Sequence, residues 1–263
     1  MSKKTITEYK NNLIHDGVVH LHGLLDEFDL LELNAAIKEN MDKPSPFGTQ
    51  LQKEGSGGKF FTDFNNWKRL PKIENFCRKE KILEVIKDLT GSKTGRLFHD
   101  HVLVKEGASI ATPWHQDRPY YIFKGDLNLS IWMPSAEVAE DSSLVFWRGS
   151  HKLNKLYMPK GFSDGRPLGD DDKFLDLKEE DIPVSEVMSF EMKAGDAIVF
   201  LNNTVHGSKP HSGPEARRAL SIRMLLDGAT MTTDYVNATP PFDRMGVKVV
   251  EGGEIPERFP VLW

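Results

Sequence analysis

Apolar residues in the first third of the chain recur at the spacing of amphipathic helices. Asp26 is a suitable N-cap for a helix that runs to about Met41. A second helix is predicted from Lys81 to Thr90, and Gly91 is well placed to end it. The apolar positions that indicate these helices are Phe28, Leu31, Ala35 and Ile37 in the first and Ile82, Val85, Ile86 and Leu89 in the second. We expect both helices to pack against a sheet.

From Leu97 onward the pattern changes to short runs rich in β-branched and aromatic residues, which is typical of strands. The predicted strands are Leu97 to Lys105, Leu127 to Met133, Ser143 to Trp147, Val187 to Met192, Ala197 to Leu201 and Arg218 to Leu226. Short strands at this spacing favour a closed β architecture.

Composition narrows the class of protein. A chain of 263 residues can bury one sizeable core, so one domain is the simplest expectation. Because the net charge is -5 and the pI is near 6.0, we expect no nucleic-acid partner. The single Cys77 excludes an intramolecular disulfide, and the polar start at Met1 to Lys4 lacks the apolar run of a secretory signal. We therefore expect a cytoplasmic protein with no membrane span.

The clearest chemical signal is the tetrapeptide Trp114-His115-Gln116-Asp117. His115 is the only one of nine histidines that has an acidic residue two positions later. If this segment is a strand, positions 115 and 117 share one face and present a nitrogen and a carboxylate oxygen together. His206, about ninety residues later, would supply a second imidazole from another strand. Two histidines and one carboxylate form the facial triad that leaves coordination positions open on non-haem Fe(II).

Other segments follow this pair in a characteristic order: Leu129 to Pro134, Gly149-Ser150-His151, His206-Gly207-Ser208 and Arg217 to Ser221. Together with the tetrapeptide they make residues 95 to 227 resemble the phytanoyl-CoA dioxygenase family of Fe(II)- and 2-oxoglutarate-dependent oxygenases. Two features depart from the family. The acidic-small-Gly turn is replaced by Glu140-Asp141-Ser142-Ser143, and nothing marks a coenzyme A pocket.

The resemblance implies a mainly β fold with flanking helices, in which a double-stranded β-helix (a cupin-like jelly-roll) forms the core. On this basis we expect a single domain over residues 1–263, with a helical preamble over about 1–95, the jelly-roll over about 96–227 and a C-terminal extension over 228–263. The implied activity is hydroxylation of a small-molecule metabolite, with O2 and 2-oxoglutarate consumed and succinate and CO2 released. The triad His115, Asp117 and His206 would bind Fe(II), and Trp132 and Ser208 match positions of the cosubstrate pocket.

An arginine is the residue that 2-oxoglutarate would require, because its distal carboxylate needs a permanently charged, bidentate partner. Arg217 is the predicted partner. Strand alternation places it on one face with Ala219, Ser221 and Arg223, where two small residues leave room for a ligand. The opposite face would carry Arg218, Leu220, Ile222 and Met224 and pack against helices.

A rival metal constellation is His99-Asp100-His101, because His-x-His on a strand also begins cupin-type sites. Used as ligands, His99 and His101 would indicate a Zn or Mn hydrolase or isomerase, and a jelly-roll that only binds a small molecule is a second alternative. We favour a place in the substrate pocket, since Asp117 already supplies the anionic ligand. The predicted substrate-binding residues are His99, Lys105, Tyr120, Tyr121 and Phe61.

Residues 161–183 form the least core-like stretch, with two acidic runs and few large apolar residues. A connection of this length is either a functional lid over a site or a solvated acidic loop. His20 and His22 form another His-x-His pair, without a nearby carboxylate in the sequence, and are expected to be structural.

Overall fold

The computed structural model describes residues 3–52, 57–162, 164–211 and 213–263. It contains four α-helices: α1 (Lys3–Asp16), α2 (Glu27–Asp42), α3 (Pro71–Cys77) and α4 (Glu80–Thr90). The strands are β1 (Val18–Leu21), β2 (Thr49–Leu51), β3 (Phe60–Phe64), β4 (Arg96–Lys105), β5 (Thr112–His115), β6 (Phe123–Lys124), β7 (Leu129–Pro134), β8 (Leu144–Trp147), β9 (Val187–Ser189), β10 (Ala197–Leu201), β11 (His206–Ser208), β12 (Arg217–Leu225) and β13 (Thr230–Met231).

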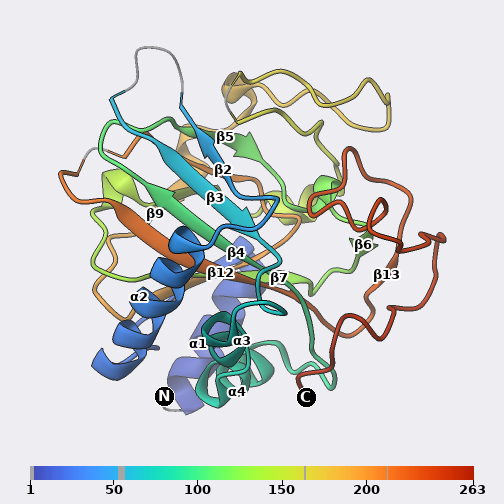
Figure 1. Ribbon diagram of the computed structural model, residues 1–263. Coiled ribbons are helices and arrows are strands. Elements are labelled where there is room, and N and C mark those ends of the chain that lie inside the picture. The colour runs from blue at the N-terminus through green and yellow to red at the C-terminus, as the bar shows by residue number, and fades with distance from the viewer. Residues whose placement is uncertain (1–2, 53–56, 163, 212) are drawn as a thin grey trace.

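Two antiparallel sheets form the jelly-roll that the sequence predicts. The larger sheet has the order β1-β10-β7-β12-β4-β3-β2, and the smaller one has the order β5-β11-β8-β9. Strands distant in sequence are therefore neighbours: β12 lies between β7 and β4 and pairs with both. The helices cover one face of the large sheet, at the bottom of Figure 1, and the small sheet lies on the other side.

Strand β12 shows how the large sheet separates a packing face from a site face. Leu220, Ile222 and Met224 belong to the core shared with the helices, as alternation predicts. The opposite face of β12 is directed to the space between the sheets, and Arg217 and Arg223 at its two ends line a cavity there. One continuous strand thus contributes to both the core and the site.

The predicted helices are present, and their ends are as expected. Asp26 caps α2 and accepts a hydrogen bond from the Asp29 backbone N–H, while Gly91 ends α4 in the left-handed conformation at φ 69°. The predicted apolar face of α2 was wrong at two positions. Phe28 is 66% exposed and Leu31 is 70% exposed. The residues that α2 buries follow i, i+3, i+4 spacing in another phase: Leu33, Ala36 and Ile37.

The first 95 residues are not only helical. Strands β1, β2 and β3 come from this region and extend the large sheet at both of its edges. Strand β1 pairs with β10, and β3 pairs with β4. This addition matters for the site, because β3 brings its side chains beside those of β4.

Residues after β12 close one end of the barrel. Phe242 and Phe259 pack with Phe98, Tyr121 and Phe123 in a separate aromatic cluster. The segment is the red chain at the right of Figure 1. Within the described residues, no helix is both long enough and apolar enough to span a bilayer.

Candidate active site

Two histidines face each other across neighbouring strands of the small sheet. His115 is the last residue of β5, and His206 is the first residue of β11. The antiparallel register pairs these two residues directly, so their ring centroids lie 4.3 Å apart. Gly207 allows this approach, because a Cβ there would lie 2.8 Å from the Thr112 carbonyl oxygen. The second strand that was predicted to supply His206 is therefore present as β11.

Backbone carbonyls fix the orientation of both rings. Nδ1 of His115 donates to the Pro113 carbonyl at 2.8 Å, and Nδ1 of His206 donates to the Thr204 carbonyl at 3.0 Å. Each Nε2 is consequently the unprotonated nitrogen, whose lone pair is available for a metal. Burial lowers the pKa of both rings, that of His206 to about 3, so neutral imidazole is the stable form.

Asp117 completes the triad from a turn and not from a strand. Strand β5 ends at His115, and Asp117 has helical backbone angles, φ -70° and ψ -34°, at the start of a short 3-10 turn. The prediction that strand alternation would align positions 115 and 117 was therefore wrong. The turn still directs Oδ1 to 3.8 Å from Nε2 of His115 and 3.9 Å from Nε2 of His206.

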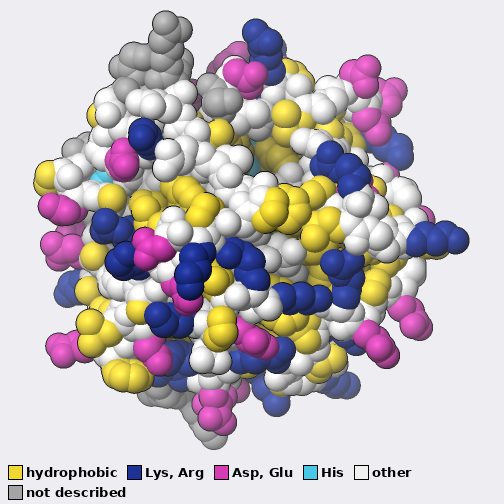
Figure 2. Space-filling model, viewed as in Figure 1, with side chains coloured by type: hydrophobic (Ala, Val, Ile, Leu, Met, Phe, Trp, Pro, Cys, Tyr) yellow, Lys and Arg dark blue, Asp and Glu magenta, His cyan; other side chains and the backbone are white. Residues whose placement is uncertain are grey.

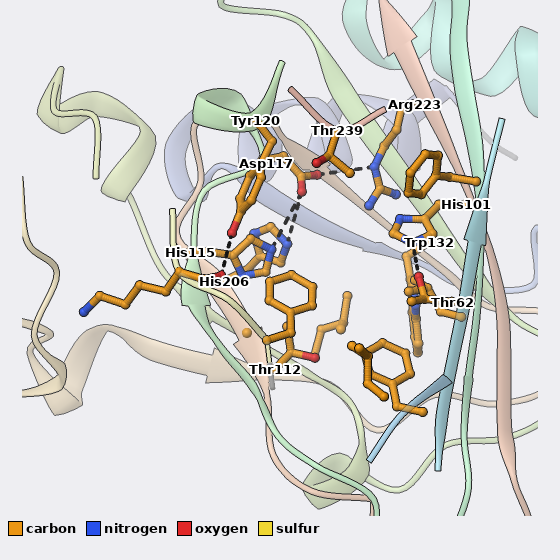
Figure 3. Close-up of a pocket in the computed structure, with 18 of the residues that line it drawn as sticks. Thr62, His101, Thr112, His115, Asp117, Tyr120, Trp132, His206, Arg223 and Thr239 are labelled. Atoms are coloured by element: carbon orange, nitrogen blue, oxygen red, sulfur yellow. Dashed lines mark hydrogen bonds and ion pairs between the residues drawn. The ribbon is translucent and has the colours of Figure 1, made fainter. Parts of the chain in front are cut away.

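The second carboxylate oxygen of Asp117 is held by one hydrogen bond and one ion pair. Ser130 Oγ donates to Oδ2 at 2.8 Å, and Arg223 Nε lies 3.4 Å from the same oxygen. Burial alone would raise the pKa of Asp117, but Arg223 and the two histidines hold it well below its usual range. Figure 3 shows Asp117 between the histidine pair and Arg223.

These three side chains fit a divalent metal ion. The ligand atoms of His115, Asp117 and His206 lie within 4.8 Å of one another, and all three residues are buried. Two neutral nitrogens and one carboxylate oxygen are the donor set of non-haem iron sites with open coordination positions. A metal would need only to draw these atoms slightly together.

Arg217 lines the same cavity as the triad and is buried without an acidic partner among the described residues. Its Nη1 donates to the Ser142 backbone carbonyl, and its guanidinium lies 5.4 Å from the Trp132 ring centroid. Burial lowers its pKa to about 10, so the group keeps its charge at neutral pH. Nε1 of Trp132 is also buried with no hydrogen-bond partner in the described structure. A buried cation and an unused donor suit the distal carboxylate of 2-oxoglutarate.

Lys105 and Ser208 lie next to this arginine but do not line the cavity. Lys105 Nζ is hydrogen bonded to Ser208 Oγ at 2.7 Å, to Thr112 Oγ1 at 2.9 Å and to the Ile110 carbonyl at 2.9 Å. Burial, and then the charge of Arg217, lower the pKa of Lys105 to about 6. The expected role of Lys105 in the substrate pocket is therefore corrected: the side chain lies behind the wall and joins β4 to the small sheet.

The cavity has a volume of about 430 Å³. Of the predicted substrate-binding residues, His99, Tyr120 and Tyr121 line it. Phe61 does not, because it points to the opposite face of β3 and packs into the core under the helices. Its neighbours on the other face of the strand, Phe60, Thr62 and Phe64, line the cavity instead.

Sequence reasoning assigned no role to three of the residues that matter here, and it covered a fourth, Phe162, only as part of a possible lid. Arg223 and Ser130 hold Asp117, while Phe162 and Thr239 line the cavity from loops. Alternation along β12 already placed Arg223 on the face of Arg217, and that was its only signal. Phe162 lies in the stretch 161–183 that could form a lid, whereas Thr239 carried no signal, since its position depends on the folded chain.

The rival pair of histidines forms no metal cluster within the described residues. Nδ1 of His99 donates to the Asp100 carbonyl, and Nε2 of His101 is hydrogen bonded to Thr62 Oγ1. Oδ1 of Asp100 accepts backbone N–H bonds from Asn66 and Trp67, while Oδ2 is buried with no hydrogen-bond partner among the described residues. The geometry supports the interpretation that His99 and His101 belong to the cavity wall.

A second cluster of possible metal ligands lies near the C-terminal end of β1. The side chains of His20, His22 and Asp196 lie together, so the fold gives His20 a carboxylate neighbour that is distant in sequence. Asp196 also accepts hydrogen bonds from the backbone N–H groups of Gly23 and Lys193. These bonds connect the turn at Gly23 to the turn at Lys193, so the cluster has a structural role.

Comparison with known proteins decides the family. A family model described as phytanoyl-CoA dioxygenase (PhyH) matches residues 14–219, which is most of the chain. The chain belongs to the phytanoyl-CoA dioxygenase family. Fe(II) and 2-oxoglutarate, the cofactors that the sequence predicts, are those of this family. A probable phytanoyl-CoA dioxygenase from Caenorhabditis elegans is 22% identical over 207 residues, which is 76% of this chain but only 65% of that relative.

Solved structures share the fold of this family member. The epimerase SnoN, in complex with Fe3+, alpha ketoglutarate and nogalamycin RO, is 20% identical with a TM-score of 0.77 and full coverage of both chains. The carbocyclase SnoK from nogalamycin biosynthesis is 20% identical with a TM-score of 0.74, covering 99% of this chain and 96% of its own. The non-heme monooxygenase ThoJ reaches a TM-score of 0.64 at 15% identity, covering 96% of this chain and 88% of its own. At this level of identity the likeness shows a common jelly-roll fold.

Proposed function

We propose that this chain is an Fe(II)- and 2-oxoglutarate-dependent dioxygenase that hydroxylates a small-molecule metabolite and releases succinate and CO2. The observation that carries the proposal is the joint presence, in one cavity, of the buried His-Asp-His triad and an arginine with no acidic partner in the described residues. The first fits a metal and the second fits a carboxylate. A structural jelly-roll has no need for either.

Each residue has a defined task in this proposal. His115 and His206 offer the Nε2 lone pairs, and Asp117 offers Oδ1 while Ser130 and Arg223 retain Oδ2. Arg217 binds the distal carboxylate of 2-oxoglutarate and so orients its keto-acid end toward the triad. Bound iron supplies the oxidative decarboxylation of 2-oxoglutarate and the oxidation of the substrate.

The structural relatives make the outcome of the oxidation the point to test. SnoN is described as an epimerase and SnoK as a carbocyclase, so enzymes of this fold can catalyse reactions other than hydroxylation. The presence of Asp117 as the carboxylate ligand leaves no place for a halide and so argues for hydroxylation over halogenation. It does not separate hydroxylation from epimerisation or ring closure. The mass of the product separates the outcomes: hydroxylation adds one oxygen atom, epimerisation leaves the mass unchanged and ring closure removes two hydrogens.

The test begins with metal and cosubstrate. We expect the purified protein to bind one Fe(II) per chain, to develop a weak visible band on anaerobic addition of 2-oxoglutarate, and to release succinate with O2. Asp117→Ala should lose most of its iron affinity and all turnover. Normal turnover by this variant would contradict the triad assignment. Zinc or manganese alone, with hydrolysis or isomerisation, would favour the rival use of His99 and His101, and no stoichiometric metal would favour a binding protein.

A further inference from the structure

The charged groups on the cavity wall are few, and each has a partner or an assigned ligand. Among the described residues the wall carries Asp117, Lys160, Arg217 and Arg223 as its only ionised side chains. Asp117 and Arg223 pair with each other. Arg217 is assigned to 2-oxoglutarate under the proposed function. Lys160 remains to be explained.

Lys160 does not offer its charge to the cavity. Its Nζ lies 2.8 Å from Asp176 Oδ1 and donates to the Leu177 carbonyl at 2.8 Å. Both contacts lie within the loop segment that follows Lys160 in the chain. A ligand in the cavity would have to compete with a carboxylate already in contact.

The other titratable groups on the wall are uncharged. Burial holds the pKa of His99 well below its usual range and lowers that of His101 to about 3, so both rings are neutral at physiological pH. Burial also keeps the hydroxyls of Tyr120 and Tyr121 protonated by raising their pKa values. The wall therefore provides no free counter-ion for a charged ligand.

The remaining wall is hydrophobic with neutral hydrogen-bonding groups between the rings. Phe60, Phe64 and Phe162 are among its aromatic members, and Thr62 and Thr239 are among its polar ones. Figure 2 shows hydrophobic side chains around a hollow in the upper half of the drawn face. A cavity of about 430 Å³ is in the range that encloses a small organic ligand.

We propose that the part of the primary substrate that enters this cavity is uncharged, with an apolar, ring-sized skeleton and neutral oxygen functions. This inference rests on the proposed function, which reserves Arg217 and the triad for 2-oxoglutarate and iron. An ionised group placed beside Phe64 or Thr62 would lose its hydration without gaining an opposite charge. A neutral group at the same place would lose far less hydration free energy.

Three probes with one ring system test the proposal: 2-naphthalenemethanol, 2-naphthoate and 2-naphthalenemethylamine. Binding is measured by ligand-observed NMR on protein loaded with Zn(II) and saturating 2-oxoglutarate, so that Arg217 is occupied. We expect the neutral alcohol to bind about tenfold or more tightly than either ion, since an unpaired buried charge is costly. Faster relaxation of its ring protons when anaerobic Fe(II) replaces Zn(II) would place the probe beside the metal.

A variant of the wall provides the matched control. Leu103 lines the cavity from β4, and Leu103→Lys should shift the preference toward 2-naphthoate, whereas Leu103→Met should keep the order of wild type. Tighter binding of either ion to wild type, or no binding of the alcohol, overturns the proposal. Failure to bind metal or 2-oxoglutarate would instead contradict the proposed function, and the probe order is then read in metal-free protein.

Discussion

Arg223 Nε lies 3.4 Å from Asp117 Oδ2, and each of these two residues is 5% exposed. Among the described residues, Arg223 is the only lysine or arginine within 4.0 Å of this carboxylate. It also donates to the Tyr121 hydroxyl at 3.0 Å, which keeps the guanidinium in place. A metal ion at the triad would bring a second positive charge to the same carboxylate.

The first prediction follows from this shared carboxylate. Arg223→Met should lower the free energy of unfolding of metal-free protein by about 3 kcal/mol or more, because it leaves a buried carboxylate without a cation. Adding Zn(II) should restore more stability to the variant than to wild type, since the ion replaces the missing charge. Urea unfolding with and without Zn(II) measures both effects, and the exposed Arg218→Met serves as control. Equal metal-free stability of the variant and wild type would contradict the pairing.

Arg217 and Arg218 lie on opposite faces of β12, so the second prediction separates them. Arg217→Ala should weaken 2-oxoglutarate binding roughly 30- to 100-fold, because a charge-assisted contact contributes about 2 to 3 kcal/mol. Arg218→Ala should change binding much less, and both variants should keep their affinity for iron. Anaerobic titration of 2-oxoglutarate, followed by the visible band, gives the constants. A large loss at Arg218 with no effect at Arg217 would reverse the assignment.

The third prediction concerns the buried amine of Lys105. Its pKa is about 6 in the folded protein and near 10.5 in the unfolded chain, so the unfolded chain holds the extra proton between these values. The free energy of unfolding of wild type should therefore rise with pH across this window, by up to about 1.4 kcal/mol per pH unit, and fall as pH drops toward 6. Lys105→Met should lack this rise.

Urea unfolding at pH 7, 8 and 9 measures the slope for Lys105. The exposed Lys155→Met is the control and should keep the slope of wild type. Parallel pH profiles for wild type and Lys105→Met would show that the amine stays protonated inside the fold.

The fourth prediction concerns the acidic stretch of residues 161–183, whose first residues line the cavity. The Phe162 ring centroid lies 5.0 Å from that of His115, where it can exclude water from the metal. Phe162→Ala should raise succinate release uncoupled from product several-fold, with iron and 2-oxoglutarate binding unchanged. Leu175→Ala, at a residue of the same segment that is 44% exposed, is the matched control. Unchanged coupling in Phe162→Ala would favour a solvated loop with no role as a lid.

Local rules explain what the sequence could predict. Spacing pointed to His115 and Asp117, and the family resemblance supported His206 as the third ligand. Alternation placed Arg217 and Arg218 on opposite faces of β12, and Arg217 lines the cavity. Helix ends at Asp26 and Gly91 followed from backbone chemistry. Each of these inferences needs only residues a few positions apart, together with the resemblance to one family.

Contacts between distant parts of the chain explain what the sequence could not predict. Phe61 was assigned to the wrong face because strand β3 was not predicted, and without its partner β4 the phase of alternation is undefined. The bonds of Arg223 to Asp117 and of Lys105 to Ser208 join residues about a hundred positions apart. Asp117 lies outside the strand because β5 ends at His115, and residue spacing in the sequence does not show where a strand ends.

The direct pairing of His115 with His206 has a consequence for the folding of the chain. An ion bound to both rings ties together two points about ninety residues apart, and closing so long a loop removes much of the freedom of the unfolded chain. Strand β5 lies at the edge of its sheet and pairs only with β11 among the described strands. A bound ion should therefore also make this edge of the sheet more rigid. Removal of the ion with a chelator should loosen β5, so that its backbone amides exchange with solvent before those of the other strands.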